Sequence, residues 1–341
     1  MKKKQIIFLL FLGLTAIAFK GKGDRDIERP GHFPEPTYAF QNNPMSADKI
    51  YLGRVLFYDP ILSRDNTIAC SNCHSPYNAF THVDHALSHG IEDREGKRNS
   101  PALMNLAWQP YFMWDGAINH LDMQSLFPIT HPDEMGESIE SVVVKLKEKR
   151  AYRNLFAKAY GDSSITGERL LKAISAFMVQ LVSANSKYDS VMRKTSIFTA
   201  QEKRGYDLFK AQCNSCHAEP LFTNYTFESN GLPFDPILKD VGRVGISQNS
   251  KDSFLFKVPT LRNIEFSYPY MHDGRFKKLK EVMSHYNRDF GNVKYGGEKK
   301  SIQLSSEEQV DLMAFLLTLS DRAFLFNRDY AYPRDFSHEG K

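Results

Sequence analysis

Cys70-Ser71-Asn72-Cys73-His74 and Cys213-Asn214-Ser215-Cys216-His217 are two copies of the pattern CxxCH, and they contain all four cysteines of the 341-residue chain. This spacing is the attachment signature of c-type haem. The two cysteine sulfurs of each copy can bond to the porphyrin edge, and the adjacent histidine can bind the iron. The motifs therefore predict two covalently bound haem c groups, attached at Cys70, Cys73, Cys213 and Cys216, with His74 and His217 as iron ligands.

Paired cysteines also occur in sites other than haem attachment sites, and these alternatives fit the sequence less well. A CxxC pair also occurs in zinc sites, redox dithiols and local disulfides. None of these requires a histidine directly after the second cysteine, and only 11 of the 341 residues are histidine. A zinc ribbon usually places its pairs roughly 15–20 residues apart, whereas these pairs begin at residues 70 and 213. Haem attachment is the interpretation that explains both histidines.

The N-terminus has the pattern of a secretory signal peptide. Three lysines, Lys2 to Lys4, precede an apolar run from Ile6 to Phe19, and Ala16-Ile17-Ala18 provides small residues for cleavage. The run is too short for a comfortable membrane span, although an uncleaved anchor is the alternative. We expect residues 1–18 to be a signal peptide and the mature protein to be periplasmic. Export agrees with haem attachment, which takes place outside the bacterial cytoplasmic membrane.

The charge balance argues against a nucleic-acid partner. The chain has 44 basic and 40 acidic residues, a formal net charge of +4. Lys2, Lys3 and Lys4 lie in the predicted signal peptide, so the mature chain is close to neutral. No basic and aromatic repeat is present that would point to nucleic-acid binding.

The spacing of apolar residues predicts a mainly α fold made of two cytochrome c-like haem domains, with long loops around the cofactors. We expect a mobile lead-in at residues 19–43, an N-terminal haem domain at 44–190 and a C-terminal haem domain at 199–330. Helices are expected over 44–57, 138–160 and 168–188. Capping boxes at Thr199/Glu202 and Ser305/Glu308 open two more.

Loop sequences around both motifs resemble the bacterial di-haem cytochrome c peroxidases and the related MauG-type enzymes. The resemblance runs from about residue 35 to about residue 325. It is carried by Arg98-Asn99-Ser100-Pro101, Met113-Trp114-Asp115-Gly116, Pro132-Asp133-Glu134-Met135, Val258-Pro259-Thr260-Leu261-Arg262-Asn263 and Tyr268-Pro269-Tyr270-Met271-His272-Asp273-Gly274. It implies that the first haem is the peroxide site and that the second stores or relays an electron.

The resemblance also implies roles for three side chains near the haems. Glu134 matches the distal acid–base carboxylate, because peroxide must lose a proton to bind iron and the departing oxygen must receive one. Gln124 matches an amide that orients peroxide, and Trp114 matches an indole between the two haems. The alternatives are an ordinary loop acid, a surface helix glutamine and a core tryptophan.

The ligands opposite His217 and His74 are less regular. Where peroxidases of this family usually have a methionine, this chain has Tyr286, as the MauG-type enzymes do; Met283, His285 and Met271 are rival ligands. A phenolate stabilises ferric iron more than a thioether does. On the first haem, His89 lies near the family's displaceable histidine, and its binding would make peroxide access depend on a loop movement; a solvated loop histidine is the alternative.

A calcium ion is also implied by the resemblance, held by Asn99 and by the backbone carbonyls of Ser267 and Pro269. Oxygen ligands of this kind suit a hard cation. His272 lies where the family has a histidine close to the second haem, and we do not expect it to bind iron.

The sequence thus favours an exported peroxidase that reduces hydrogen peroxide to water with electrons from a small c-type cytochrome or a cupredoxin. A MauG-like oxidase acting on residues of a partner protein is the alternative enzyme, and a non-enzymatic di-haem electron carrier is the third hypothesis. A homodimer is compatible with the sequence.

Overall fold

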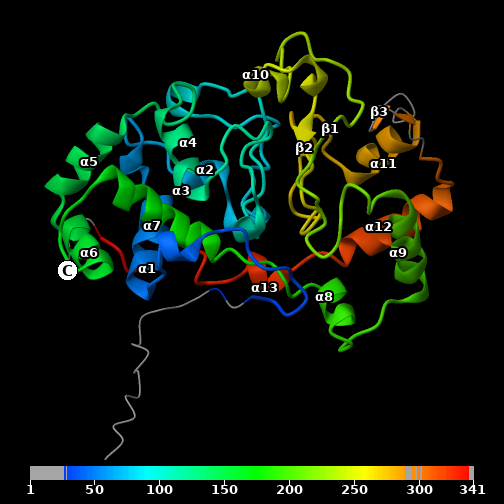
Figure 1. Cartoon of the computed structure of the whole chain (residues 1–341), viewed down its shortest axis with the longest axis horizontal. Helices are drawn as coiled ribbons and strands as arrows, with labels where there is room; N and C mark the ends of the chain where they lie inside the picture. The colour runs from blue at the N-terminus through cyan, green and yellow to red at the C-terminus, as the bar shows by residue number, and fades with distance from the viewer. Residues whose placement is uncertain (1–26, 28, 289–293, 296–297, 300–301, 338–341) are drawn as a thin grey trace, which may run out of the picture.

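The computed structural model describes residues 27, 29–288, 294–295, 298–299 and 302–337. It is mainly helical, which confirms the predicted fold class. In the described part of the chain, β structure is limited to two antiparallel two-stranded ladders and isolated bridges. Figure 1 shows two lobes, with α1, α6 and α7 in one and α9, α11 and α12 in the other.

The first lobe is built on the contact between helices α1 (Ala47–Tyr58) and α7 (Gly167–Val179). Around them lie the remaining helices of this half of the chain: α2 (Cys70–Cys73), α3 (Leu121–Gln124), α4 (Leu126–Thr130), α5 (Ile139–Glu148), α6 (Arg150–Tyr160) and α8 (Lys187–Met192). Short 3-10 turns connect them: η1 (Phe40–Asn42), η2 (Pro60–Leu62), η3 (Pro76–Asn78), η4 (Ile91–Asp93) and η5 (Leu106–Trp108).

Two of the expected helices are each divided in the structure. Extended backbone at Lys149 separates α5 from α6, so the expected helix over 138–160 is two helices. The one expected over 168–188 ends with α7, and α8 begins after a new N-cap at Ser186. Ser186 forms a capping box with Asp189, which stabilises a fresh helix start. Apolar spacing continued across both breaks, and therefore did not reveal them.

The second lobe is built on α9 (Ala200–Gln212) and α12 (Ser306–Leu317), which pack together. Both open with the predicted capping boxes. The other elements are α10 (Val244–Ser247), α11 (Leu279–Arg288), α13 (Arg322–Leu325), η6 (Ser250–Asp252), β1 (Phe227–Glu228), β2 (Phe256–Lys257), β3 (Lys294–Tyr295) and β4 (Glu298–Lys299). Strand β1 pairs with β2, and β3 pairs with β4.

The expectation of a mobile lead-in at 19–43 is wrong for its described part. Phe33 is 2% exposed and lies edge-on against Trp108, with ring centroids 5.2 Å apart. His32 contacts Asp189 through its Nε2 atom at 2.7 Å. The segment is rich in charge, glycine and proline, but Phe33 belongs to the core, and Tyr38 and Phe40 pack against that core. Composition alone did not show this.

The two hydrophobic cores do not divide the chain at a single point. One core contains α1, α7 and Phe33, and the other contains Phe209, Phe222 and Phe315. Phe324 and Leu325 of α13 belong to the first core, although we expected residues 199–330 to form the second domain. The chain therefore returns to the first lobe near its end. Among the described residues no helix has the length and apolarity to cross a membrane, and the expected signal peptide lies outside the described residues.

In each of the two helix pairs, a glycine lies where the helix backbones come closest. A Cβ atom on Gly53 of α1 would lie 1.8 Å from the Ala173 carbonyl oxygen in α7. A Cβ atom on Gly205 of α9 would lie 1.9 Å from the Asp311 carbonyl oxygen in α12. Only glycine lets the two helix backbones approach this closely.

We expect Gly205→Ala to destabilise the protein by about 1–3 kcal/mol, because the added methyl forces α9 and α12 apart. Chemical denaturation of the holoprotein measures the change. Gly96→Ala is the matched control, since a Cβ atom there meets nothing within 4 Å; its stability should be unchanged or slightly raised. Equal stabilities of the two variants would contradict the close-packing argument.

Candidate functional site

The first CxxCH motif presents a half-buried, oriented imidazole. Cys70 to Cys73 form the single turn α2, whose start is closed by the Asn72 side chain accepting from the Ala69 N–H at 2.9 Å. His74 places Nδ1 2.7 Å from the Phe80 carbonyl oxygen. Because a carbonyl can only accept, Nδ1 carries the proton and Nε2 is left unprotonated. Burial lowers the pKa of His74 to about 4, which keeps the imidazole neutral, as iron ligation requires.

The second motif repeats this arrangement. The Nδ1 atom of His217 lies 3.1 Å from the Pro259 carbonyl oxygen and 3.3 Å from that of Phe222. Burial lowers the pKa of His217 to about 4. Phe80 and Phe222 are fully buried, and both have a positive φ, 57° and 55°. Each therefore turns its carbonyl toward the imidazole from a backbone conformation that bulky residues rarely adopt.

The sequence analysis missed these two acceptors, although a signal for them was present. A Phe-Thr pair follows each motif, as Phe80-Thr81 and as Phe222-Thr223. The two stretches differ by one residue in their distance from the histidine, which obscures the repeat.

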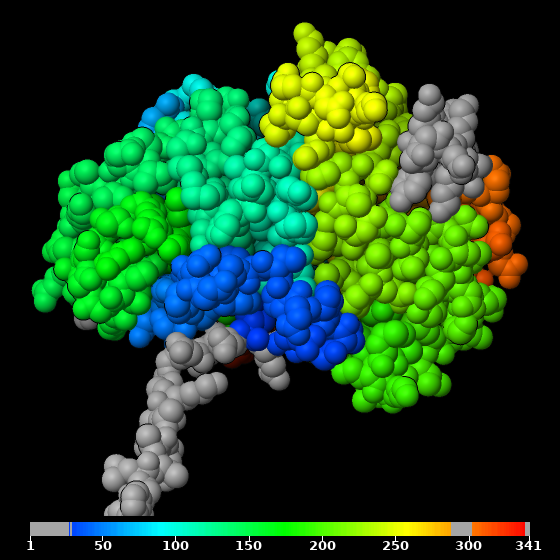
Figure 2. All heavy atoms as spheres, in the orientation of Figure 1, coloured from blue at the N-terminus to red at the C-terminus, as the bar shows by residue number. Residues whose placement is uncertain are grey.

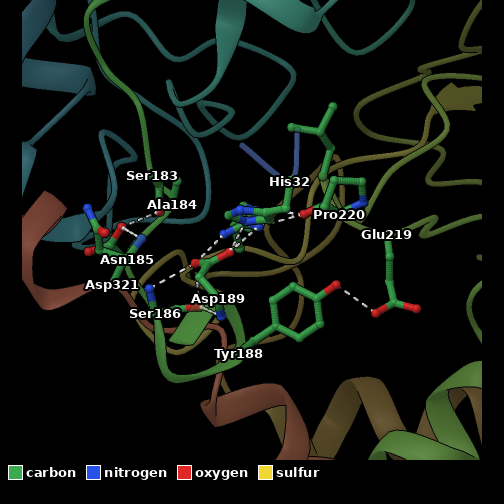
Figure 3. Close-up of polar contacts among 12 residues, drawn as sticks. His32, Ser183, Ala184, Asn185, Ser186, Tyr188, Asp189, Glu219, Pro220 and Asp321 are labelled. Carbon is green, nitrogen blue, oxygen red and sulfur yellow. Dashed lines mark hydrogen bonds and ion pairs between the residues drawn. The ribbon is translucent and has the colours of Figure 1, made fainter. Parts of the chain in front are cut away.

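Asp189 is the centre of a buried polar network that reaches Pro220, three residues after His217 (Figure 3). Its carboxylate accepts from Arg262 at 2.8 and 2.9 Å, and also from His32 and from Ser186. Arg262 has no exposed surface, and it also donates to the Pro220 carbonyl oxygen. The network thus holds the loop that carries Phe222. Neither Arg262 nor Asp189 was identified as a site residue from the sequence.

A cavity of about 250 Å³ lies between the lobes. The second motif lines it through Cys213, Cys216 and His217. It is also lined by the other predicted site residues Asn99, Trp114, Gln124, Ser267, Pro269 and Tyr286. The structure therefore brings most of the predicted residues to one place, around the second motif and the boundary between the lobes.

An internal duplication builds this boundary. Residues 101–118 and 259–276 share the strings Pro-x-Leu-x-Asn and Met-x-Asp-Gly, and the bridge Phe112↔Ile118 has its counterpart in Tyr270↔Phe276. The Asn99 N–H donates to the His272 carbonyl oxygen at 2.7 Å, and the Lys257 N–H donates to the Trp114 carbonyl oxygen at 2.7 Å. The halves are joined by equivalent, reciprocal main-chain hydrogen bonds.

Trp114 and Gln124 lie at this boundary, and each donates a hydrogen bond to a neighbouring residue. The Trp114 indole donates to the Asn99 carbonyl oxygen at 2.8 Å, which fixes its ring at the cavity wall. Gln124 donates through Nε2 to the Met113 sulfur at 3.1 Å. Its Oε1 is buried and has no hydrogen-bond partner in the described part of the chain. An unsatisfied acceptor of this kind suits a ligand that donates a hydrogen bond.

Glu134 is positioned by its backbone beside the first motif. Its carbonyl oxygen accepts from the Ile91 N–H at 2.8 Å, and a Cβ atom on Gly90 would lie 2.5 Å from that oxygen. Burial raises the pKa of Glu134 to about 7, with a smaller contribution from Asp133. The Glu134 charge in turn adds to the rise that burial produces in the pKa of Cys70 and Cys73. The carboxyl group therefore lies within electrostatic range of both attachment cysteines.

Tyr286 has the equivalent relation to the second motif. It lies on α11, and burial raises its pKa, with added contributions from Cys213 and Cys216. Met283, one turn earlier, lines the same cavity. His285 does not line it, and its Nε2 donates to the Asn230 carbonyl oxygen at 2.7 Å. Tyr286 and Met283 thus remain as ligand candidates on α11, while His285 has another partner.

Met271 and His89 are placed differently from these candidates. Met271 lines the cavity, and its sulfur accepts from the Asn230 amide at 3.3 Å. His89 pairs through Nδ1 with Asp93 at 2.6 Å. Its backbone carbonyl lies 3.9 Å from the Cys73 sulfur. The His89 loop is therefore next to the first motif, and ligation by this histidine stays a prediction.

The predicted calcium ligands Asn99, Ser267 and Pro269 line the cavity together. The Asn99 side chain donates through Nδ2 to the Ala86 carbonyl oxygen at 3.0 Å. In the described ranges no group of three or more His, Cys, Asp or Glu side chains could hold a metal ion. One amide and two carbonyls are not a set of that kind, and the calcium site stays a prediction.

The donor set fits covalently bound haem. All four cysteines are free of disulfides. Each following histidine is neutral and is oriented through Nδ1. The cavity beside the second motif has mostly apolar walls, including Leu261, Ile264 and Leu316.

Comparisons with known proteins agree with this geometry. The family model of the di-haem cytochrome c peroxidases matches residues 47–196, and the cytochrome c model matches residues 202–320. The methylamine utilization protein MauG of Methylophilus methylotrophus is 34% identical, over 93% of this chain and 95% of that protein. The cytochrome c551 peroxidase of Nitrosomonas europaea is 32% identical over 81% of each chain.

Among solved structures, a MauG-like protein associated with microbial copper homeostasis superposes with a TM-score of 0.81. It is 30% identical, and the match covers 91% of this chain and 99% of that one. With the ordered motifs and the two oriented imidazoles, these matches show that the chain belongs to the di-haem cytochrome c peroxidase and MauG family of oxidoreductases.

Proposed function

We propose that this protein reduces hydrogen peroxide to water at the first haem, with electrons that enter from a small c-type cytochrome or a cupredoxin. The observation that carries the proposal is the half-buried Glu134, whose pKa is raised by desolvation to about 7 within electrostatic range of Cys70 and Cys73. A carboxyl group with this pKa is present in both protonation states near neutral pH, and acid–base catalysis of peroxide cleavage uses both.

The protein residues would divide the work as follows. Haem iron, when bound, supplies the electrons that break the O–O bond. Glu134 would take one proton from peroxide and return it to the departing oxygen. Gln124 would accept a hydrogen bond from peroxide through its unpartnered Oε1. The overall reaction consumes two electrons and two protons for each peroxide and yields two waters.

Trp114 would provide the electronic contact between the two haems. Its indole is held at the cavity wall by the Asn99 carbonyl, and its own carbonyl accepts from Lys257 of the other half. A rigid π system at the boundary needs little reorganisation when an electron passes. We further propose that calcium at Asn99, Ser267 and Pro269 stiffens this boundary, and that His89 controls access to the first haem.

A protein partner has a candidate surface near this boundary. The excursion 229–255, which joins β1 to β2 and carries α10, forms a projection at the top of Figure 2. It exposes large apolar side chains: Phe234, Ile237, Val241, Ile246 and Phe254. Exposed apolar groups in such number are typical of interaction sites. The proposed location of the encounter is the periplasm, after cleavage of the signal peptide.

The second candidate is MauG-like oxidation of residues in a partner protein. The observation that favours it is Tyr286, which lines the cavity near Cys213 and Cys216. An anionic oxygen ligand would stabilise high oxidation states of the second haem and make it a poor electron reservoir. Relatives named MauG are among the most similar proteins. Both candidates use the same peroxide site.

Glu134→Gln should reduce peroxide turnover by a factor of about 10²–10⁴, since an amide cannot exchange the proton. The wild-type rate of reaction with peroxide should rise with pH through about 7 as Glu134 ionises. Stopped-flow kinetics of the reduced holoprotein across pH measures both effects.

Asp133→Asn is the matched control for this experiment. It removes the neighbouring charge that contributes to the raised pKa of Glu134, so the rate should persist and its rise should move to lower pH. Full turnover by Glu134→Gln would refute the assignment. Negligible turnover by the wild type, oxidised or pre-reduced, would instead favour the carrier hypothesis.

Tyr286→Phe should change the absorption and EPR spectra of one haem only, because it removes the ligand oxygen and leaves the ring in place. Tyr270→Phe is the matched control: Tyr270 lines the same cavity, but its hydroxyl donates to the Ile264 carbonyl. Met283→Leu tests the rival ligand. Unchanged spectra in Tyr286→Phe would rule out tyrosine ligation.

The electron donor separates the two candidate enzymes. With peroxide and a ferrous small cytochrome c, a peroxidase should oxidise two cytochromes per peroxide in repeated turnovers. A MauG-like oxidase should react with peroxide as readily but turn over poorly with the cytochrome. Rapid-mixing spectroscopy of donor oxidation measures this, and slow donor oxidation after fast peroxide consumption would transfer the proposal to the second candidate.

A further inference from the structure

We propose that Lys257 is a haem-binding residue that pairs with a propionate carboxylate of the haem carried by Cys213 and Cys216, and that its charge raises the midpoint potential of that haem. The inference requires only that haem occupies the cavity, and it goes beyond the proposed peroxide reaction.

Lys257 is a buried cation, and no acidic side chain pairs with it in the part of the chain that the structure describes. The residue is 8% exposed, and it lines the cavity. Among the described residues it forms no ion pair, and its Nζ lies 6.0 Å from the Tyr225 ring centroid, at the outer limit of a cation–π contact. Burial lowers its pKa to about 8. An ammonium group this deep is costly unless it meets an anion.

The backbone holds Lys257 firmly where it is. In β2 it pairs with Phe227 of β1, and its N–H donates to the Trp114 carbonyl oxygen. The preceding residue, Phe256, stacks on His272 with ring centroids 3.7 Å apart. With its backbone fixed in this way and its side chain in the cavity lining, the charge of Lys257 belongs to the cavity.

The duplication shows that the charge is specific to one half. Lys257 stands two residues before Pro259, and its equivalent, Asn99, stands two residues before Pro101. Their main-chain hydrogen bonds are the same, at 2.7 Å each. The duplicated main-chain arrangement therefore does not require a lysine at this position. A neutral amide serves in the first half, and an ammonium is present only in the second.

The anion that this site would meet is a haem carboxylate. Each haem carries two propionates, which are ionised at neutral pH unless their surroundings prevent it. Of the two CxxCH motifs, only the second lines the cavity, through Cys213, Cys216 and His217. A fixed positive charge beside this haem favours its ferrous form, because reduction adds a negative charge. The effect persists in salt, since a buried charge is poorly screened.

The test is a redox titration of holoprotein variants, with the two ferric haems followed through their separate EPR signals. Lys257→Met should lower the midpoint potential of the second haem and leave the first unchanged. Lys257→Arg, which keeps the charge, should stay close to wild type. Lys251→Met removes an exposed lysine from the same excursion and should also stay close to wild type.

Two results would overturn the proposal. One is an unchanged potential of the second haem in Lys257→Met that carries both haems. The other is a shift confined to the first haem. If Lys257→Met fails to mature, resonance Raman spectra of Lys257→Arg decide the matter, because a guanidinium should move the propionate bending band of one haem. Propionate bands identical to wild type would then refute the pairing.

Discussion

The orientation of two half-buried imidazoles is the constraint on which the rest of the molecule depends. His74 donates its Nδ1–H to the Phe80 carbonyl, and the His217 Nδ1–H faces the carbonyls of both Pro259 and Phe222. Hydrogen bonding at Nδ1 fixes the tautomer, leaves Nε2 for iron and increases the basicity of the ligand. Both phenylalanines are fully buried and have a positive φ. Because a positive φ is unfavourable for a bulky residue, the surrounding packing must hold Phe80 and Phe222 in place.

Around Phe222 that packing includes an ion pair with no exposure. Removing Arg262 and Asp189 from water is costly, and the bidentate contact, with the further bonds to Pro220 and His32, offsets much of the penalty. Breaking such a pair by removing one partner typically costs about 3–5 kcal/mol. The pair connects α8, the loop that carries Pro220 and Phe222, and the N-terminal segment that carries His32. We interpret it as a lock on geometry more than as a source of net stability.

Features with a local cause could be predicted from the sequence. The CxxCH spacing and the capping boxes at Thr199 and Ser305 depend on residues a few positions apart. The break at Lys149 and the docking of Phe33 depend on tertiary packing, which apolar spacing does not record. Glu134 was found only through family resemblance, since its raised pKa arises from burial beside Gly90 and the first motif. Lys257 was missed because nothing local distinguishes it from a surface lysine.

The duplicated frame explains how one fold can hold two unlike haem sites. The bonds that join its halves are made by main-chain atoms of Asn99, Trp114, Lys257 and His272. Main-chain bonds survive side-chain substitution, so the side chains that face the cavity were free to diverge. At equivalent positions of the two halves, the Trp114 indole corresponds to the His272 imidazole, and the Asn99 amide corresponds to the Lys257 ammonium. Each haem site can therefore be tuned without disturbing the frame, and the division of labour that we propose between reaction site and relay depends on this freedom.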